Sequence, residues 1–333
     1  MSDPGTLAAE RGLKAIEKRI RKIYKGAMEE LYRTIASYNL RYMKQDQEMR
    51  KKLAEGVITQ TEYNQWLKNT VFMGHAWDAK VEHCTEVLNN ANRQAMAVIR
   101  GEQLDVFAEN MTYQAFLLET GTGIDLSFGI YSSQTVSRLL KSQPELLPRK
   151  VVDGVKCAAW NKNKIANVIT QSIIKGDGIP GIAKSLAETL AKQNDSTMVR
   201  YARTAMTSAQ NAGRVEMMQE AEDEGIHTLK KWIATLDDRT RDAHAELDGE
   251  TAEVDEPFEN EIGKIMYPGD PTADPANVYN CRCTLGSVIE GVDIKGERRA
   301  YKEWDDENGK HHRESYLIED MTYKEWKEWK EGR

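Results

Sequence analysis

The stretch WIATLDDRTRDAHAELDGE, residues 232–250, starts with a β-prone run and continues into charged, turn-rich sequence. Further along, YNCRCTL, residues 279–285, contains two of the chain's four cysteines with a single residue between them. Closely spaced cysteines are typical of a metal site, a redox pair or a packed loop. The first question is therefore what Cys281 and Cys283 do together, and whether His244 of the upstream stretch joins them.

Both stretches lie in a segment that predicts short strands. The run HTLKKWIATLD at 227–237 predicts one strand, and CTLGSVIEGV at 283–292 predicts a second. RESYLIEDM at 313–321 predicts a third strand, and TYKEWKEWKEG at 322–332 predicts a short closing helix. An acidic, proline-rich loop separates the first two strands. This segment therefore predicts a compact module of strands, turns and short helices.

The sequence before this module predicts long helices. Apolar side chains at steps of three and four run through residues 7–55, which indicates a long amphipathic helix. A turn at Gly56 and an N-cap at Thr59 or Thr61 then begin a second helical stretch that continues to Arg100. The N-terminal part of the chain is therefore predicted to be a helical hairpin.

Two more helices are predicted directly before the strands. One begins near Ile182, and the next has Asp195 as its N-cap and Gly225 as its stop. Small residues surround the second helix, so its polar row is expected to point into a site. The row consists of Arg200, Arg203, Thr204, Ser208 and Asn211. The glycine-rich stretch at 121–133 is interpreted as a turn, because no Gly-Lys-Ser/Thr follows it.

These elements predict an α+β protein with a long helical N-terminal region, a hairpin or bundle, followed by a compact α+β C-terminal module. The predicted domains are a helical region at 1–194, the module at 195–295, and a strand-and-helix tail at 296–333 that packs on the module. Trp232 and Phe258 are expected in the core. Three tryptophans are expected to anchor the tail: Trp304, Trp326 and Trp329.

Composition limits the class of protein. The chain has 333 residues, 30% of them charged, and no apolar run long enough to predict a transmembrane helix. Its N-terminus lacks the features of a signal peptide, so we expect a protein made and kept in a reducing cytoplasm. Four cysteines in such a chain do not predict a disulfide framework. Cys84 and Cys157 are interpreted as small buried apolar side chains.

Charge is distributed unevenly along the chain. Residues 1–52 carry thirteen Lys and Arg against seven Asp and Glu, whereas residues 237–275 carry three against thirteen. The basic segment includes a group largely off the apolar stripe: Lys14, Lys18, Arg21, Lys22 and Lys25. Such a group suits phosphate contacts that need no sequence readout, while the apolar stripe suits docking on another protein. The plainer interpretation is that each segment forms a solvent-exposed surface, one positively and the other negatively charged.

One ordered series of motifs is more specific than its parts. RTAMTSAQNAGR at 203–214 on a helix is followed by a strand with Trp232, then Asp237-x-Arg239-Thr240-Arg241, His244, LDG at 247–249 and NCRC at 280–283. Over residues 195–295 this series resembles the phage head morphogenesis family, the Mu F-like minor head proteins of tailed bacteriophages. EGVITQTEYNQWL at 55–67 and MTYKEWKEW at 321–329 also look like that family.

The resemblance implies a minor head protein found in the virion, inside the head, and made in the bacterial cytoplasm. Its implied partners are the portal protein, capsid or scaffold proteins and, without sequence preference, packaged DNA. Its implied role is in head assembly and in DNA packaging and ejection. Some family members carry cysteine at the positions of Arg241 and His244, which implies a metal-bound version of the module. The residues found here depart from that pattern.

The residues themselves leave several interpretations of the site open. Zinc usually takes four Cys or His ligands, and this segment offers His244, Cys281 and Cys283, with His227 or Asp237 as conceivable additions. We expect no cofactor, and a structural clasp in which the cysteines and His244 hold the proline-rich loop against the DDRTRDAH element. A disulfide is not expected in a reducing compartment with one intervening residue.

The charged residues around the clasp are expected to form a buried polar network without catalysis. In it Arg239 and Arg282 pair with Asp237 and Asp248. The full predicted network is Arg203, Asn211, Asp237, Arg239, His244, Asp248 and Arg282. The alternative is a nuclease or an ADP-ribosyl-transfer-like enzyme with His244 as acid–base group.

Overall fold

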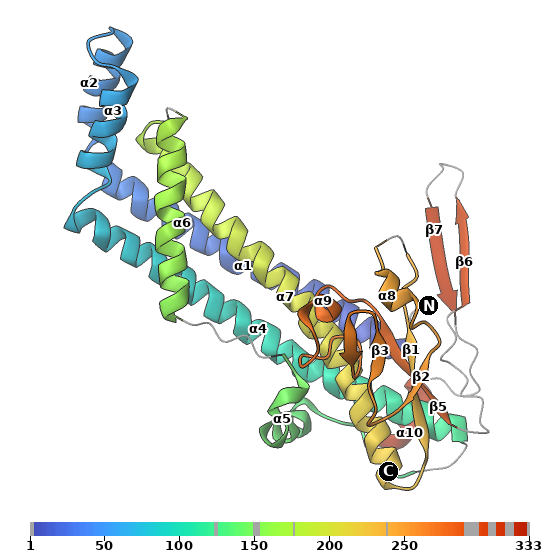
Figure 1. Ribbon diagram of the computed structural model, residues 1–333. Coiled ribbons are helices and arrows are strands. Elements are labelled where there is room, and N and C mark those ends of the chain that lie inside the picture. Colours follow the sequence, from blue (N-terminus) through green and yellow to red (C-terminus); the bar gives the residue numbers. More distant parts are fainter. Residues whose placement is uncertain are drawn as a thin grey trace. The chain divides into compact units, whose positions relative to one another are not determined.

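The computed structural model (Figure 1) describes the chain in eight ranges: 3–122, 126–148, 154–175, 177–237, 239–289, 300–305, 311–316 and 323–331. Within these ranges only the backbone is described at 154–158, 300–305, 311–316, 325, 329 and 330.

Helices dominate the first two thirds of the sequence, and short strands follow, which confirms the predicted α+β class. The helices are α1 (Pro4–Asn39), α2 (Met43–Ala54), α3 (Gln60–Trp66), α4 (His75–Thr122), α5 (Ser133–Ser142), α6 (Gly154–Ile174), α7 (Ile179–Asp223), α8 (Asp242–Ala245), α9 (Pro275–Val278) and α10 (Tyr323–Glu331). A π-helical turn spans Leu67–Val71 and a 3₁₀ turn spans Pro144–Leu146. The strands are β1 (Thr228–Ile233), β2 (Thr251–Glu253), β3 (Phe258–Asn260), β4 (Gly263–Ile265), β5 (Thr284–Ile289), β6 (Ala300–Asp305) and β7 (His311–Tyr316).

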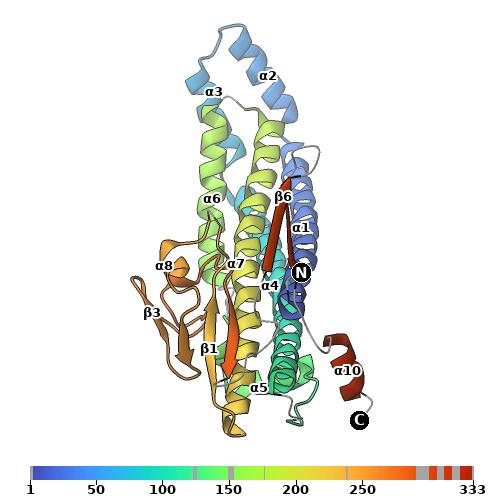
Figure 2. The same ribbon diagram turned by 90° about the vertical axis from the view of Figure 1, so that its right-hand side faces the viewer.

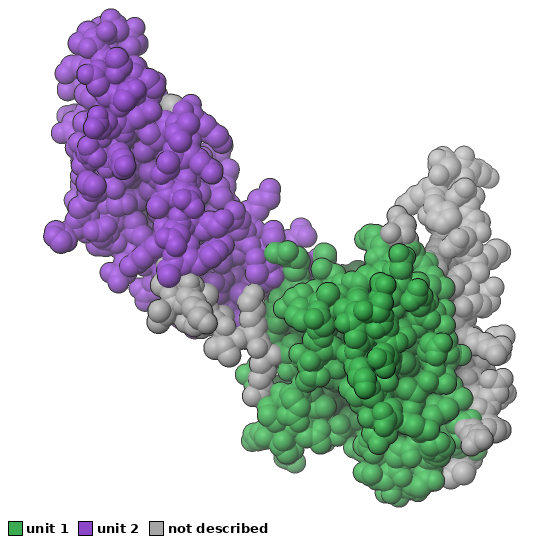
Figure 3. All heavy atoms as spheres, in the orientation of Figure 1, with its two compact units in different colours: residues 1–16, 99–149, 200–333 green, residues 17–98, 150–199 purple. Residues whose placement is uncertain are grey.

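The chain divides into two compact units, each built from segments that are distant in the sequence (Figure 3). Unit 1 comprises residues 1–16, 99–149 and 200–333, and unit 2 comprises residues 17–98 and 150–199. The predicted boundaries after residues 194 and 295 divide the chain linearly, whereas these units group helix segments with later elements. Among the described residues, no helix is both long and apolar enough to cross a membrane.

Unit 2 is a helical bundle with an apolar core. Segments of α1, α4, α6 and α7 contribute buried side chains, and α6 and α7 run side by side (Figure 2). Its core contains Leu31, Ile35, Leu88, Ile169, Leu186 and Leu190, among others. Tyr24 of α1 donates a hydrogen bond to Asn92 of α4, which confirms the predicted pairing of the first helices.

Two helix boundaries in unit 2 differ from the predicted ones. The long helix predicted within 7–55 is two helices, because the apolar stripe ends near Tyr38 and Leu40 is 67% exposed. The second predicted helix is also interrupted, at Phe72–Gly74, where Gly74 adopts a φ of 90°. The predicted start at Thr59 is confirmed, since Thr59 and Glu62 form a reciprocal capping box.

The prediction of two helices meeting at Asp195 is wrong. α7 is continuous, so Asp195 lies in its interior and is not an N-cap. The physical reason is an apolar stripe that runs through this point, from Leu190 to Met198 and Ala202, all of them buried. Burial raises the pKa of Asp195. The predicted stop at Gly225 is confirmed, with a φ of 86°.

Unit 1 contains an antiparallel three-stranded sheet in the order β2-β1-β5. Side chains of β1 alternate between buried and partly buried, and Trp232 is paired with Leu285 of β5. The backbone of Leu285 faces away from β1: its N–H donates to Asn211 and its carbonyl accepts from Arg214, both on α7. Side chains of a helix therefore complete the hydrogen bonds of an edge strand.

The remaining strands form two separate hairpins, β3–β4 and β6–β7. The predicted strand at 313–321 is found in part as β7, paired with β6. The predicted closing helix is α10, where Trp326 is buried and donates to Glu119 at 2.9 Å. The side chains of Trp304 and Trp329 lie outside the described ones.

Candidate functional site

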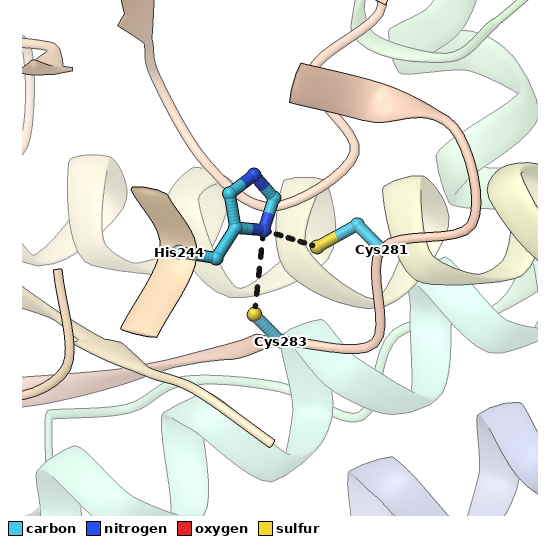
Figure 4. A group of neighbouring side chains, drawn as sticks. All are labelled: His244, Cys281 and Cys283. Atoms are coloured by element: carbon cyan, nitrogen blue, oxygen red, sulfur yellow. Dashed lines mark hydrogen bonds between the residues drawn. The ribbon is translucent and has the colours of Figure 1, made fainter. Parts of the chain in front are cut away.

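His244, Cys281 and Cys283 converge in unit 1 (Figure 4). His244 lies on α8, directly after the loop that follows β1, and the cysteines lie between α9 and β5. His244 Nδ1 is 3.5 Å from Cys281 Sγ and 3.7 Å from Cys283 Sγ. His244 is 1% exposed, and each cysteine is 3% exposed. Three soft donor groups are thus gathered in a site closed to solvent.

Two asparagines orient the imidazole: Asn277 accepts a hydrogen bond from it, and Asn260 holds Asn277 in place. The backbone N–H groups of Ile262 and Gly263 donate to Asn260 Oδ1, which fixes the orientation of that amide. Asn277 Nδ2 donates to the same oxygen, so Asn277 Oδ1 faces His244 Nε2 at 3.0 Å. An amide oxygen only accepts, so His244 carries its proton on Nε2. The lone pair of neutral His244 therefore lies on Nδ1, toward both sulfurs.

The two thiols shift each other's pKa values in opposite directions. A hydrogen bond from Cys281 lowers the pKa of Cys283, against the opposing effect of burial. The same hydrogen bond, together with burial, raises the pKa of Cys281 well above its usual value. Both cysteines are free, so no disulfide links them.

The other described cysteine, Cys84, lies in the core of unit 2, where burial raises its pKa to about 12. The side chain of Cys157 lies outside the described ones.

The polar face of α7 holds the backbone of the NCRC segment. Thr207 Oγ1 donates to the carbonyl of Cys281 at 2.9 Å, and Asn211 Nδ2 donates to those of Cys283 and Pro268 at 3.3 and 3.0 Å. Gly269 has a φ of 87°, and a Cβ there would lie 2.8 Å from the Ser208 nitrogen. The loop therefore packs directly on α7.

The remaining network residues divide into separate contacts. Asp237 accepts two hydrogen bonds from Arg282, at 2.5 and 2.6 Å, which hold its pKa well below the usual range. Arg239 is 3.6 Å from Asp237 and mostly exposed. Asp248 accepts from the Ala234 N–H at 2.8 Å. Arg203 lies on an exposed face of α7. The structure brings only some of the predicted set together, with His244 in the buried cluster and Asp237 in an outer ion pair.

Residues 163–286 match the family described as "Phage Mu protein F like protein". This part of the chain is similar to Mu F-like proteins. The resemblance drawn from the motif series is thereby confirmed, and the matched range contains α7, the three-stranded sheet, His244 and both cysteines.

Three curated proteins are similar to the chain. It is 29% identical over 203 residues to the minor head protein GP7 of Bacillus phage SPP1, covering 58% of this chain and 62% of that protein. It is 32% identical over 165 residues to an NAD(+)–arginine ADP-ribosyltransferase, EFV, of Enterococcus faecalis, covering 43% of this chain and 32% of that protein. It is 26% identical over 184 residues to an uncharacterized protein of Haemophilus influenzae, covering 55% of this chain and 37% of that protein.

The matches span less than two thirds of each relative's own length. No solved structure matches the chain.

The surroundings of His244 limit its use as a general acid or base. His244 is enclosed by Trp232, whose ring is 5.4 Å away edge to face, and both its ring nitrogens face protein groups. A general acid or base must reach the proton it transfers. In this arrangement His244 can hold a loop or coordinate an ion, but substrate does not reach it.

Sequence reasoning missed two buried groups of unit 1 that position this module. Arg214 of α7 contacts Asp3, Asn110 and the Leu285 carbonyl, at 2.5, 3.1 and 2.7 Å. Lys230 is fully buried beside Phe258 and donates to the Val254 carbonyl at 3.1 Å; burial lowers its pKa to about 8. Arg214 was visible as the last residue of RTAMTSAQNAGR, but its partner is at the other end of the chain.

The five basic residues singled out on α1 are all at exposed positions: Lys14, Lys18, Arg21, Lys22 and Lys25. The apolar stripe of the same helix is buried within the chain, with Ile20 and Leu31 fully enclosed. The stripe is therefore occupied by the protein's own core. Docking through α1 would use its charged face.

Proposed function

We propose that this chain is a minor head protein of a tailed bacteriophage, located inside the head. In this proposal it associates with the portal protein during assembly and assists DNA packaging and ejection. The observation that carries the proposal is the Mu F-like match over 163–286, a range in which His244, Cys281 and Cys283 form a buried cluster. Similarity to the minor head protein of phage SPP1 supports the same role.

The proposal assigns portal contact to the charged face of α1. The exposed basic side chains there include Lys14, Lys18, Arg21, Lys22 and Lys25, while the apolar stripe of the helix is buried. Exposed basic residues favour an acidic protein surface or the phosphates of packaged DNA, and both contacts weaken with salt. We place the portal first, and make DNA binding an outcome of the test.

The test begins with purified virions and procapsids of a phage that encodes this chain. Mass spectrometry should find the chain at low copy in particles, co-purifying with the portal. Its absence from both particle types would overturn the proposal.

The charged face of α1 is tested separately, in a variant with its five named basic residues changed to Gln. The control is a variant in which the exposed Lys44, Lys51 and Lys52 of α2 are changed to Gln. Portal capture should fall only in the first variant. If capture is unchanged but gel-shift affinity for duplex DNA falls, the face binds DNA instead.

An enzymatic role is the second candidate, because one relative is named an NAD(+)–arginine ADP-ribosyltransferase. It is tested by incubating the full chain with labelled NAD⁺ and an arginine acceptor, and separately with nucleic acid and divalent metal. Turnover that is lost in His244→Ala or Arg239→Ala would establish it. Absence of turnover agrees with the buried position of His244.

A further inference from the structure

The spacing of the donor atoms around His244 matches the edges of a metal coordination shell. Bonds of about 2.3 Å to sulfur and about 2.0 Å to nitrogen place ligand N and S atoms about 3.5 Å apart around a tetrahedral zinc ion. The measured Nδ1–Sγ distances are 3.5 and 3.7 Å. All three donor atoms lie within 4.8 Å of one another. The two N–S distances therefore already match those around a bound zinc ion.

Hydrogen bonds to His244 Nδ1 can use only one of the two thiols. Neutral His244 has one lone pair on Nδ1, and two sulfurs lie at nearly equal distances from it. Only one thiol can donate well to that lone pair. A cation at the centre would bond to all three donors at once.

His244 makes the hydrogen bond that a metal-binding histidine usually makes through its other ring nitrogen. Histidines that bind metals usually donate the other ring N–H to a carbonyl or carboxylate oxygen, which fixes the tautomer. Here Asn277 Oδ1 accepts from Nε2, and Asn277 is in turn held by Asn260. Asn277 is fully buried. The Nδ1 lone pair is therefore directed at the sulfurs before any ion binds.

We propose that His244, Cys281 and Cys283 bind a zinc ion that joins α8 to the loop before β5. On binding, each thiol releases its proton to solvent and the thiolate bonds to Zn²⁺, while His244 stays neutral. Among the described residues no further His, Cys, Asp or Glu belongs to the group, so the fourth ligand comes from elsewhere, with water the simplest donor. His227 instead lies near Glu222 and Glu253, and Asp237 is paired with Arg282.

The site is structural in this proposal and independent of the role in the phage head. Zinc and soft thiolate ligands suit each other, and the ion adds its binding free energy to folding. Burial of all three ligands excludes substrate. The ion would hold the NCRC segment against α8, in addition to the bonds from α7.

The experiment uses the full chain, purified without chelator. Elemental analysis should find stoichiometric zinc in the wild type, and much less in Cys283→Ser and His244→Gln. Cys84→Ser is the matched control, because Cys84 is also buried but lies in the core of unit 2. It should keep its zinc. Chelator should lower the melting temperature of the wild type and of Cys84→Ser.

Cobalt supplies a readout that does not depend on the folding of the variants. Wild-type chain stripped of metal and titrated with Co²⁺ should develop a thiolate-to-cobalt charge-transfer band, which Zn²⁺ then removes. Wild type without bound zinc and without this band would overturn the proposal, and the site would be a hydrogen-bonded clasp. Equal zinc content in the wild type and a folded Cys283→Ser would also overturn it.

Discussion

The two compact units differ in the contacts that hold each of them together internally. The core of unit 2 is a continuous apolar cluster built from helices, with Leu88, Ile169 and Leu186 among its members. Unit 1 also has an apolar cluster, which includes Phe116, Met217 and Trp326, but several of its segments meet through buried polar side chains as well. Arg214 joins α7 to Asp3 and to β5, and Asn211 joins α7 to the loop and to β5.

This difference determines which substitutions each kind of contact tolerates. Apolar packing depends on volume and tolerates shape-conserving exchange, whereas a buried hydrogen bond depends on the position of each donor and acceptor. Unit 1 contains short strands and irregular loops, whose backbone groups need partners. Side chains of α7 supply those partners, which places the His244 cluster at a defined position on the helix.

The largest effect is expected for Arg214→Met. The substitution keeps an apolar stem but leaves Asp3 and the Leu285 carbonyl without their cationic partner in a buried site. Breaking one side of a buried ion pair costs about 3–5 kcal/mol. We expect this loss in the free energy of unfolding measured with urea.

Asp3→Asn combined with Arg214→Met is the companion variant, because it removes the uncompensated charge. It should recover part of the loss. Equal unfolding midpoints for wild type and Arg214→Met would contradict the description of unit 1.

Leu186→Ala tests the other half of the comparison. Leu186 is fully buried in the apolar core of unit 2, so truncation should cost about 2–5 kcal/mol through lost contacts and a cavity. Leu186→Met conserves volume and should cost less than about 1.5 kcal/mol. If the Met variant is as unstable as the Ala variant, unit 2 does not have the tolerance that apolar packing predicts.

The sequence predicted the apolar half of this comparison better than the polar half. A stripe such as Ile20, Leu31 and Ile35 is local and periodic, so its helix and its burial can be read from spacing. Helix ends were less accurate: the continuity of α7 through Asp195 depends on packing along its whole length. Thr59 was predicted correctly because the capping box is a local signal.

The site was predicted in part, for the same physical reason. His244, Cys281 and Cys283 could be associated through their motifs, and the structure places them together. Asn277 and Asn260, which orient His244, have no distinctive spacing, and their roles follow only from three-dimensional contacts. The partnership of Arg214 with Asp3 joins the ends of a long chain and has no local signal.

A smaller effect on the free energy of unfolding is expected when Glu216 on α7 is replaced. Burial, with repulsion from Glu220 and Asp223, raises its pKa from 4.5 to about 7. Between these values the folded chain holds a proton that the unfolded chain has lost, so stability falls as pH rises through this window. Glu216→Gln keeps the uncharged form at all pH values. It should flatten the pH dependence and stabilise the chain at pH 8 by about 1 kcal/mol after discounting for partial exposure.

The control for this change is Glu224→Gln, an exposed residue just beyond α7. It should leave the pH profile of unfolding unchanged. A wild-type profile that rises between pH 4.5 and 7 because of Glu216 would contradict the assignment of a buried, repelled carboxyl group.

The central claim is that directional bonds from α7 hold the module, and Asn211→Leu tests it most directly. The leucine has a similar size but cannot bond to Pro268, Cys283 or Leu285, as Asn211 does. The control is Asn194→Leu on the same helix, because the Asn194 amide donates to the Leu190 carbonyl of its own helix.

Hydrogen–deuterium exchange should be measured on the full-length wild type and both variants. The account predicts faster exchange of the β5 amides and the 266–283 loop in Asn211→Leu, with these segments unchanged in Asn194→Leu. Equal protection of β5 and the loop in Asn211→Leu and wild type would contradict it.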